Sequence, residues 1–282
     1  MNDQNQNKNS GGKNAYLIIL TIVTVICIIF GVFWNIGGWF GHRWGSRLFN
    51  HNWSFGYTDA GETSHETMKV DAFDTIEVDL GIGQVKLEVG NGYGISYDFP
   101  EKYVPECKVK SGKLTAKQPS VHNVSNNAND DYELIITVPK DADLNKVKIN
   151  CSLGDIVIEG VDADKFDINE SLGEIRIKDA KCETLDADNS LGSINLSNVE
   201  AKTLDANLSM GDLRVTSSDI EDVRCNNSMG SVEFSGDCVY LDIDNNMGDV
   251  RIDTKSDWKG SLATDMGVVK VNGENMGTHC KR

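Results

Sequence analysis

Residues 166–192 read FDINESLGEIRIKDAKCETLDADNSLG, and this stretch contains two copies of Ser-Leu-Gly placed 19 residues apart. The glycine of this motif recurs towards the C-terminus with successive steps of 19, 19, 19, 19, 18 and 19 residues. A fixed period is typical of proteins in which one small unit stacks on the next. The seven glycines are Gly154, Gly173, Gly192, Gly211, Gly230, Gly248 and Gly267.

Apolar residues alternate with polar ones on both sides of each glycine. Phe166 and Ile168 lie seven and five residues before Gly173, and Ile175 and Ile177 lie two and four residues after it. Alternation with a period of two predicts strands that have one buried face. Each repeat therefore predicts two short strands joined at a tight corner. Because a unit of this size cannot close a core alone, neighbouring repeats must stack.

The residues of the motif predict how the corner is built. The glycine is expected to adopt a positive φ, where a Cβ atom would be strained. The residue before it is Leu or Met in every repeat, and we expect this side chain to point inward and to stack on its equivalents in the neighbouring rungs. The residues concerned are Leu153, Leu172, Leu191, Met210, Met229, Met247 and Met266.

Two departures from the period are also informative. The single 18-residue step leaves Phe234 and Leu241 in their apolar positions, so the missing residue is expected between them, around Gly236. A deletion inside a strand would instead have turned every later side chain to the other face. Gly83 is flanked by the same apolar spacing. The solenoid is therefore expected to begin near Asp71, and residues 90–146 form an irregular segment within it.

These patterns predict an all-β protein, namely a parallel β-helix or β-solenoid with rungs of ~19 residues, preceded by one N-terminal transmembrane α-helix. Residues 16–34 read YLIILTIVTVICIIFGVFW, without a charged side chain. At a rise of 1.5 Å per residue such a helix spans about 28 Å, close to the thickness of the hydrocarbon core. A cleaved signal peptide would have a shorter apolar core followed by a cleavage site with small residues.

The chain accordingly divides into four parts: a disordered cytoplasmic tail (1–14), a transmembrane helix (15–34), a juxtamembrane tether (35–70) and a β-solenoid domain (71–282) that contains the irregular segment. Two lysines precede the helix and two arginines follow it, so the count of positive charges does not set the orientation. Because the long C-terminal part has the pattern of an extracytoplasmic module, we expect a single-pass protein of the cell membrane with its C-terminal domain outside. The lipid bilayer is the expected partner of residues 15–34.

Composition excludes one class of partner. The formal net charge is -16, and an acidic body repels nucleic acid. Cations, basic polymers and basic protein surfaces suit it better. The seven cysteines show no C-x-x-C pair. We expect mostly unpaired thiols, and Cys225 occupies a position held elsewhere by Ile, Ala or Leu, so it is expected to act as a small core residue.

Outward-facing positions form acidic ladders in which a Ca²⁺ ion is one candidate ligand, since this ion takes 6–8 oxygen ligands. The favoured interpretation is a solvated face with Asn side chains hydrogen-bonded along the ladder, because no Ca²⁺-binding loop motif is present. On the following strand, Arg and Lys residues predict ion pairs between rungs. We predict no catalytic residues and no cofactor. The low-probability Ca²⁺ candidates are Asp167, Asp186, Asp188, Asp205, Asp242 and Asp244.

Residues 138–158 carry a family resemblance. A strand that ends in Val138-Pro139 is followed by DADLNKVKINCSLGDIVI at residues 141–158. This arrangement, with the repeat, resembles the bacterial "putative adhesin" domain family of unknown function over about residues 70–272. The resemblance implies a β-solenoid fold, a location at the cell envelope and, for some relatives, a link to envelope stress. It implies no catalytic residues.

The expected function is that of a membrane-anchored extracytoplasmic β-solenoid that acts as a non-enzymatic, adhesin-like interaction module, with a role in the response to envelope stress as a further expectation. Its ligand would be an envelope protein or a cell-wall polymer. Two alternatives stay open at this point, a carbohydrate-active enzyme of the β-helix type and a Ca²⁺-stabilised adhesin.

Overall fold

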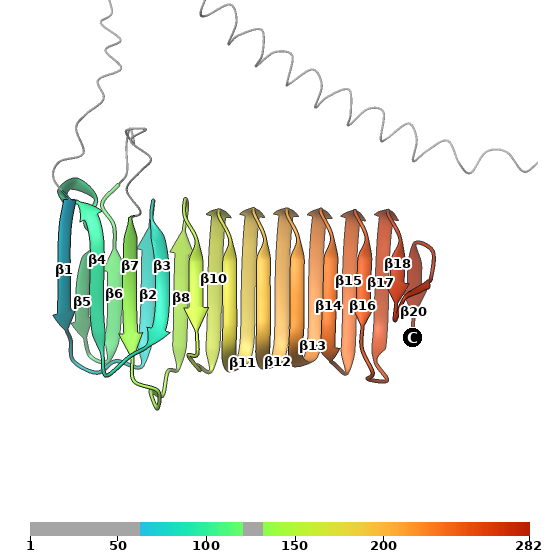
Figure 1. The fold of residues 1–282 in the computed structure, drawn as a ribbon, viewed down its shortest axis with the longest axis horizontal. Coiled ribbons are helices and arrows are strands. Elements are labelled where there is room, and N and C mark those ends of the chain that lie inside the picture. The colour runs from blue at the N-terminus through green and yellow to red at the C-terminus, as the bar shows by residue number, and fades with distance from the viewer. Residues whose placement is uncertain (1–62, 121–131) are drawn as a thin grey trace, which may run out of the picture. The chain divides into compact units, whose positions relative to one another are not determined.

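The structure is a computed structural model that describes residues 63–120 and 132–282. Its strands stack side by side in one β-solenoid (Figure 1). Within the described ranges, no helix combines the length and the apolar character needed to cross a bilayer. The predicted tail (1–14), the predicted transmembrane helix (15–34) and most of the predicted tether lie outside the described residues.

The regular rungs run through the C-terminal two thirds of the described chain. Their strands are β8 (Lys146–Cys151), β9 (Ile156–Glu159), β10 (Lys165–Leu172), β11 (Ile175–Leu191), β12 (Ile194–Met210), β13 (Leu213–Met229), β14 (Val232–Asp237), β15 (Tyr240–Met247), β16 (Val250–Asp253), β17 (Lys259–Met266) and β18 (Val269–Val271).

Successive rungs pair in parallel and in register. Leu185 of β11 lies opposite Leu204 of β12, and Leu204 lies opposite Val223 of β13. All three side chains are buried. Partners are thus one sequence repeat apart, and the predicted parallel β-solenoid is confirmed.

Each rung has three sides rather than the two strands that the repeat predicted. After Gly192, burial alternates through Ile194 and Leu196, is interrupted, and resumes at Val199 and Ala201. The interruption is a second corner, where Asn198 has a φ of 55°. We call the strand before the glycine the first side, the strand after it the second side, and the short strand beyond the second corner the third side. The third side escaped prediction because its buried positions hold mostly small side chains.

The first corner confirms the expected role of glycine. From Gly154 to Gly248 the six corner glycines have φ values between 131° and 157°. Close packing adds a second requirement, because a Cβ atom on Gly173 would lie 1.7 Å from the carbonyl oxygen of Gly154 in the preceding rung. Each of these six glycines therefore needs both an unusual conformation and the absence of a side chain. Gly267 shares only the close contact, since a Cβ atom there would lie 2.0 Å from the carbonyl oxygen of Gly248.

The expected inward direction of the Leu and Met residues at this corner is wrong. Leu191 and Met210 are each 47% exposed, and the others of the series are exposed or half-buried. Period-two alternation applies only along a straight strand, and here the chain turns at the glycine that directly follows the Leu or Met. The last inward residue lies two positions earlier, and the side chain before the glycine consequently faces out.

The buried position at this corner is the third residue before each glycine, and most of the side chains there are polar. Asn189 donates through Nδ2 to the carbonyl oxygen of Gly173 at 2.9 Å, and the Oγ1 of Thr264 donates to that of Gly248 at 2.8 Å. These side chains thus satisfy backbone carbonyls inside the corner. We call this set the inner corner column. Its members are Cys151, Glu170, Asn189, Leu208, Asn227, Asn245 and Thr264.

The 18-residue step is placed where the sequence predicts it. Thr216 of β13 lies opposite Ser235 of β14, whereas Ser218 lies opposite Gly236, so Ser217 has no counterpart. The deletion therefore falls at the second corner. Leu241 keeps its place opposite Val223.

The N-terminal end is built from β1 (Thr63–Lys69), β2 (Thr75–Leu80), β3 (Gln84–Val89), β4 (Gly94–Pro100), the 3₁₀ turn η1 (Glu101–Tyr103), β5 (Glu106–Lys110), β6 (Lys113–Lys117) and β7 (Glu133–Val138). As predicted, β2 and β3 form a rung around Gly83. Strand β2 pairs in parallel with both β6 and β8, and β3 with both β7 and β9. The irregular segment 90–146 therefore contributes a further rung, placed out of sequence order at the outer end.

Antiparallel strands close both ends of the solenoid. Strand β4 pairs with β7 and with β1, and β5 pairs with β6. Residues 63–69, predicted to belong to the tether, are therefore part of the fold. Their sequence TSHETMK lacks apolar alternation because β1 is a largely exposed edge strand. At the other end, β19 (Glu274–Asn275) and β20 (His279–Lys281) pair with β18 and β17.

Candidate functional site

The acidic ladder of the first side is a hydrogen-bonded surface. Asp188 Oδ1 accepts from Asn207 Nδ2 at 2.8 Å, and Asn226 Nδ2 donates to Asn207 Oδ1 at 3.1 Å. Burial alone would raise the pKa of Asp167, but hydrogen bonds from Lys146 and Lys148 lower it below the usual value of 3.8. The predicted hydrogen bonding along this ladder is confirmed.

The six Ca²⁺ candidates all lie on this side, but the structure does not gather them into one ligand set. Asp167 and Asp186 accept from lysines, and Asp188 and Asp205 accept from Asn207. Asp242 and Asp244 are exposed on β15. Among residues 63–120 and 132–282, no group of three or more His, Cys, Asp or Glu side chains is arranged to hold a metal ion.

The second side carries the predicted ion pairs between rungs. Arg176 contacts Asp155 of the preceding rung at 2.8 Å. The carboxylate of Glu233 forms ion pairs with Arg214 and Arg251 of the rungs on either side, each with an N–O distance of 3.0 Å. These hydrogen bonds and charges lower the pKa of Glu233 below its usual value. Because all these groups are partly exposed, each pair contributes little to stability.

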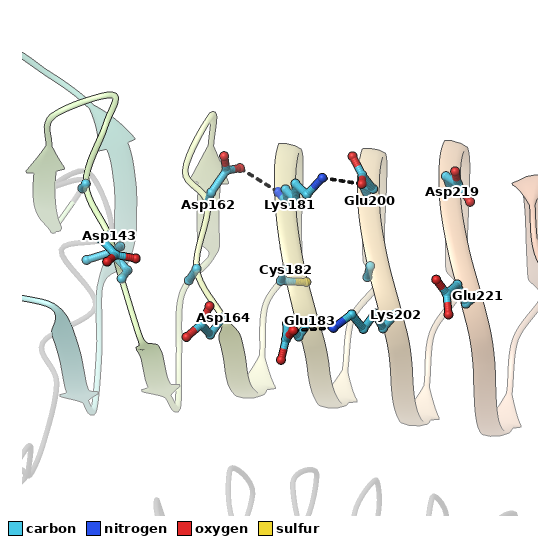
Figure 2. Close-up of a pocket in the computed structure, with 14 residues that line it drawn as sticks. Asp143, Asp162, Asp164, Lys181, Cys182, Glu183, Glu200, Lys202, Asp219 and Glu221 are labelled. Atoms are coloured by element: carbon cyan, nitrogen blue, oxygen red, sulfur yellow. Dashed lines mark hydrogen bonds and ion pairs between the residues drawn. The ribbon is translucent and has the colours of Figure 1, made fainter.

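A groove of about 410 Å³ lies on the third side. Its floor consists of small buried side chains, among them Ala163, Cys182 and Ala201. Figure 2 shows two rows of longer side chains flanking this floor. The first row is Asp162, Lys181, Glu200 and Asp219, and the second is Asp164, Glu183, Lys202 and Glu221.

The groove is strongly acidic because seven carboxylates face two ammonium groups. Lys181 contacts Glu200 of the next rung at 2.5 Å, and Lys202 pairs with Glu183. Both lysines thereby have a raised pKa. Within the described residues, the other five carboxylates of the rim are in no ion pair. Asp162 accepts a hydrogen bond from the Lys181 backbone, and in this part of the chain the other four side chains make no such contact. Those side chains are Asp143, Asp164, Asp219 and Glu221.

The thiol in the groove floor is not a nucleophile at neutral pH. Burial raises the pKa of Cys182 to about 12. The thiolate is the reactive form of cysteine, and this pKa keeps it scarce. The other described cysteines are also unpaired, and Cys225, which is 1% exposed, confirms its predicted place in the core.

The groove was absent from the sequence prediction, although a signal for it exists. Small residues recur on the third side at Ala163, Cys182 and Ala201. In each rung, Asp, Glu or Lys occupies the positions directly before and after the small residue. Two such positions per repeat are too few to show alternation in one rung. The pattern becomes visible only when several rungs are aligned on their glycines.

These features define a capped parallel β-solenoid whose rungs display separate polar surfaces. The chain belongs to the Toastrack family, DUF4097, whose family model matches residues 73–273. The suspected family and its β-solenoid fold are thereby confirmed. No significant similarity to a curated protein is found.

Solved structures that resemble this chain have low sequence identity to it. A "putative adhesin" from Bacteroides fragilis is 14% identical with a TM-score of 0.52, over 74% of this chain and 96% of that one. A "putative adhesin" from Parabacteroides distasonis is 12% identical with a TM-score of 0.46, over 75% and 97%. A "putative lipid binding protein" from the same species is 18% identical with a TM-score of 0.42, over 75% and 97%. At 14% identity the likeness to the Bacteroides fragilis structure concerns the fold.

Proposed function

We propose that this Toastrack protein is a membrane-anchored, extracytoplasmic and non-enzymatic interaction module of the cell envelope. Residues 15–34 would hold it in the bilayer, and the solenoid would present its surface to an envelope partner. Engagement of that partner during envelope stress is the expected setting. The observation that carries the proposal is the acidic groove of the third side.

The groove favours a partner with a basic segment. Five of its carboxylates are free of ion pairs within the described residues, and the two lysines are bound to glutamates of neighbouring rungs. A Lys or Arg side chain of a partner can therefore contact Asp164, Asp219 or Glu221 without first displacing an internal cation. The floor of Ala and Cys side chains leaves room for the aliphatic part of such a residue. We assign the ligand as a basic segment of an envelope protein.

Photo-crosslinking in living cells tests this assignment. A crosslinking residue replaces Glu221 in the groove of the full chain, and in a matched strain it replaces Asp244 on the first side, which is also acidic and exposed. We expect one protein to be enriched at position 221 alone. Charge reversal by Asp164→Lys and Asp219→Lys should reduce this crosslink about tenfold or more, because like charges at an interface are strongly unfavourable.

A control variant distinguishes the effect of charges in the groove from the effect of the protein's net charge. Asp242→Lys with Asp244→Lys changes the charge equally on the first side and should leave the crosslink at position 221 intact. Equal adducts at both positions, or a wall polymer in place of a protein, would show that the assigned ligand is wrong. Protease treatment of intact cells tests location separately, since protection of residues 63–282 would contradict the extracytoplasmic placement.

A further inference from the structure

A line of Leu and Met side chains follows the first corner from rung to rung, and we call it the Leu/Met ridge. In the described part of the chain, nine large apolar side chains are exposed, and six of them lie on this line. Their exposed fractions are 41–47%. A continuous exposed apolar patch indicates a binding surface more often than scattered apolar residues do. The ridge consists of Leu153, Leu172, Leu191, Met210, Met229, Met247 and Met266.

The backbone holds the ridge rigidly. Leu191 and Met210 are the last residues of β11 and β12, so the row of arrowheads along the upper edge of the regular rungs in Figure 1 marks its course. The carbonyl of Met210 accepts from the Gly192 amide at 3.0 Å, and that of Leu191 accepts from the Gly173 amide at 3.1 Å. Because the backbone here is already held by hydrogen bonds, binding to the ridge would need to order only the side chains.

Ion pairs neutralise part of the charge around the ridge. On one flank the residue before each ridge residue is an exposed Ser from rung to rung, from Ser152 to Ser228. On the other flank, Arg176 pairs with both Asp155 and Glu174. Arg251 pairs with both Asp249 and Glu233. The acidic groove lies on the third side, which does not meet the first corner. The acidic groove therefore points away from a bilayer that the ridge approaches, whereas the acidic ladder of the first side borders the ridge, so insertion relies on the apolar side chains of the ridge.

We propose that the Leu/Met ridge inserts into the headgroup region of the bilayer that holds residues 15–34, an inference that rests on the anchoring proposed above. Residues 35–62 separate that segment from the first described strand, and 28 residues span at most about 95 Å when fully extended. Seven rungs at a strand spacing of ~4.8 Å give a ridge of about 29 Å. The tether is therefore long enough for the ridge to lie along the same bilayer.

The shape of the ridge favours lipid over a second copy of the chain. It is one residue wide, and it lies on an outer corner of the solenoid rather than in a hollow. Two such ridges would touch only along a line, well short of the ~800 Å² that each partner contributes to a stable protein interface. A bilayer yields around an apolar ridge and accepts side chains about 5–10 Å deep.

Photo-crosslinking in vesicles tests the inference. The full chain is reconstituted in vesicles of equal parts phosphatidylglycerol and phosphatidylethanolamine, with either Met210→p-benzoylphenylalanine or Val239→p-benzoylphenylalanine. Val239 is the matched control, because it is apolar and 61% exposed but lies off the ridge. Since insertion buries position 210 in lipid while the tether keeps both positions near the bilayer, we expect about tenfold more lipid adducts at position 210.

Removal of the neighbouring ridge side chains should abolish the difference. Leu191→Ser with Met229→Ser changes exposed residues outside the core, and circular dichroism should report an intact fold, so the adducts at position 210 should fall to the level of position 239. Equal adducts in the unmodified chain, or adducts between two copies, would overturn the inference. Flotation of the vesicles tests the anchor separately, because a chain that does not float contradicts both proposals, whereas a floating chain with equal adducts contradicts the ridge alone.

Discussion

The side-chain amide of Asn189 donates a hydrogen bond of 2.9 Å to the carbonyl oxygen of Gly173, the corner glycine of the preceding rung. Asn227 repeats this contact with Gly211 at 3.1 Å. The first corner is therefore held by a polar residue inside the solenoid as well as by its glycine. This relationship explains why an amide recurs at a position where a hydrophobic core would be expected to hold Leu or Val.

Loss of this hydrogen bond should destabilise the solenoid. Asn189→Ala leaves the Gly173 carbonyl buried without a partner, and we expect the free energy of unfolding to fall by about 1–3 kcal/mol. Asn189→Thr should lose less, because Thr264 occupies the equivalent position and its hydroxyl donates to Gly248. Urea unfolding of the full chain in detergent, followed by circular dichroism, measures both values. Equal losses for Ala and Thr would contradict the role assigned to the side chain.

The close stacking of corner glycines gives a second prediction. Gly192→Ala would place a Cβ atom 1.8 Å from the carbonyl oxygen of Gly173. The rungs would have to separate, and we expect a loss of more than about 4 kcal/mol, an exceptional value for one substitution. Gly92→Ala is the matched control, because Gly92 has a φ of 153°, close to the 143° of Gly192, but has no atom within 4 Å of the added Cβ. Thermal unfolding distinguishes the contact from the backbone strain that both variants share.

Glu170 makes stability depend on pH. It is 4% exposed in the inner corner column, and its Oε1 accepts from the Leu172 amide at 3.0 Å. Its Oε2 has no hydrogen-bond partner among the residues that the structure describes. Burial raises its pKa from 4.5 to about 7. Between these pH values the folded state retains a proton that the unfolded state releases. The contribution of protonated Glu170 to the free energy of unfolding is therefore fully present below pH 4.5. It is lost as the pH rises towards and through 7, by up to about 3 kcal/mol.

Glu170→Gln tests this dependence because it imitates the protonated carboxyl at every pH. The variant should match the original chain near pH 4.5 and should unfold at a higher temperature near pH 8. Comparing the two chains at each pH cancels the contributions of all other titrating groups. A constant difference between them across this range would refute the assignment to Glu170.

The fold was predictable because its decisive residues repeat. Ile175 and Ile177 alternate in one rung, and their equivalents alternate in every other, so the parallel pairing followed from spacing alone. The direction of Met210 was not predictable in the same way. It lies in phase with the buried residues of its strand, and only the backbone reversal at Gly211, a three-dimensional feature, places it outside.

The candidate site was less accessible to sequence reasoning. The ladder that includes Asp188 and Asn207 could be identified because its residues repeat at one position of each rung. The groove combines outward residues from several rungs with a floor of small side chains such as Ala201, and this floor gives no hydrophobic signal. Strand β1 was missed for a related reason, since an exposed edge strand needs no apolar alternation.

The second corner beside Gly236 should accept an added residue. Insertion of Asn between Ser235 and Gly236 would restore the residue opposite Ser217, which has a φ of 51°. Asn tolerates this conformation, and Asn198 adopts it at the equivalent position with a φ of 55°. The register of β15 would not change, so we expect the melting temperature to shift by less than about 2–4 °C, the shift that corresponds to about 1 kcal/mol in a domain of 150–250 residues.

The same insertion inside a strand should be far more harmful. Asn placed between Leu241 and Asp242 would move Asp242 into the inward position of Ile243 and turn Ile243 outward. Burial of an unpaired carboxylate and loss of a core side chain should prevent stable folding of the C-terminal rungs. Limited proteolysis and circular dichroism compare the two insertions directly. Similar damage from both would show that the second corner is not the tolerant position that the 18-residue step indicates.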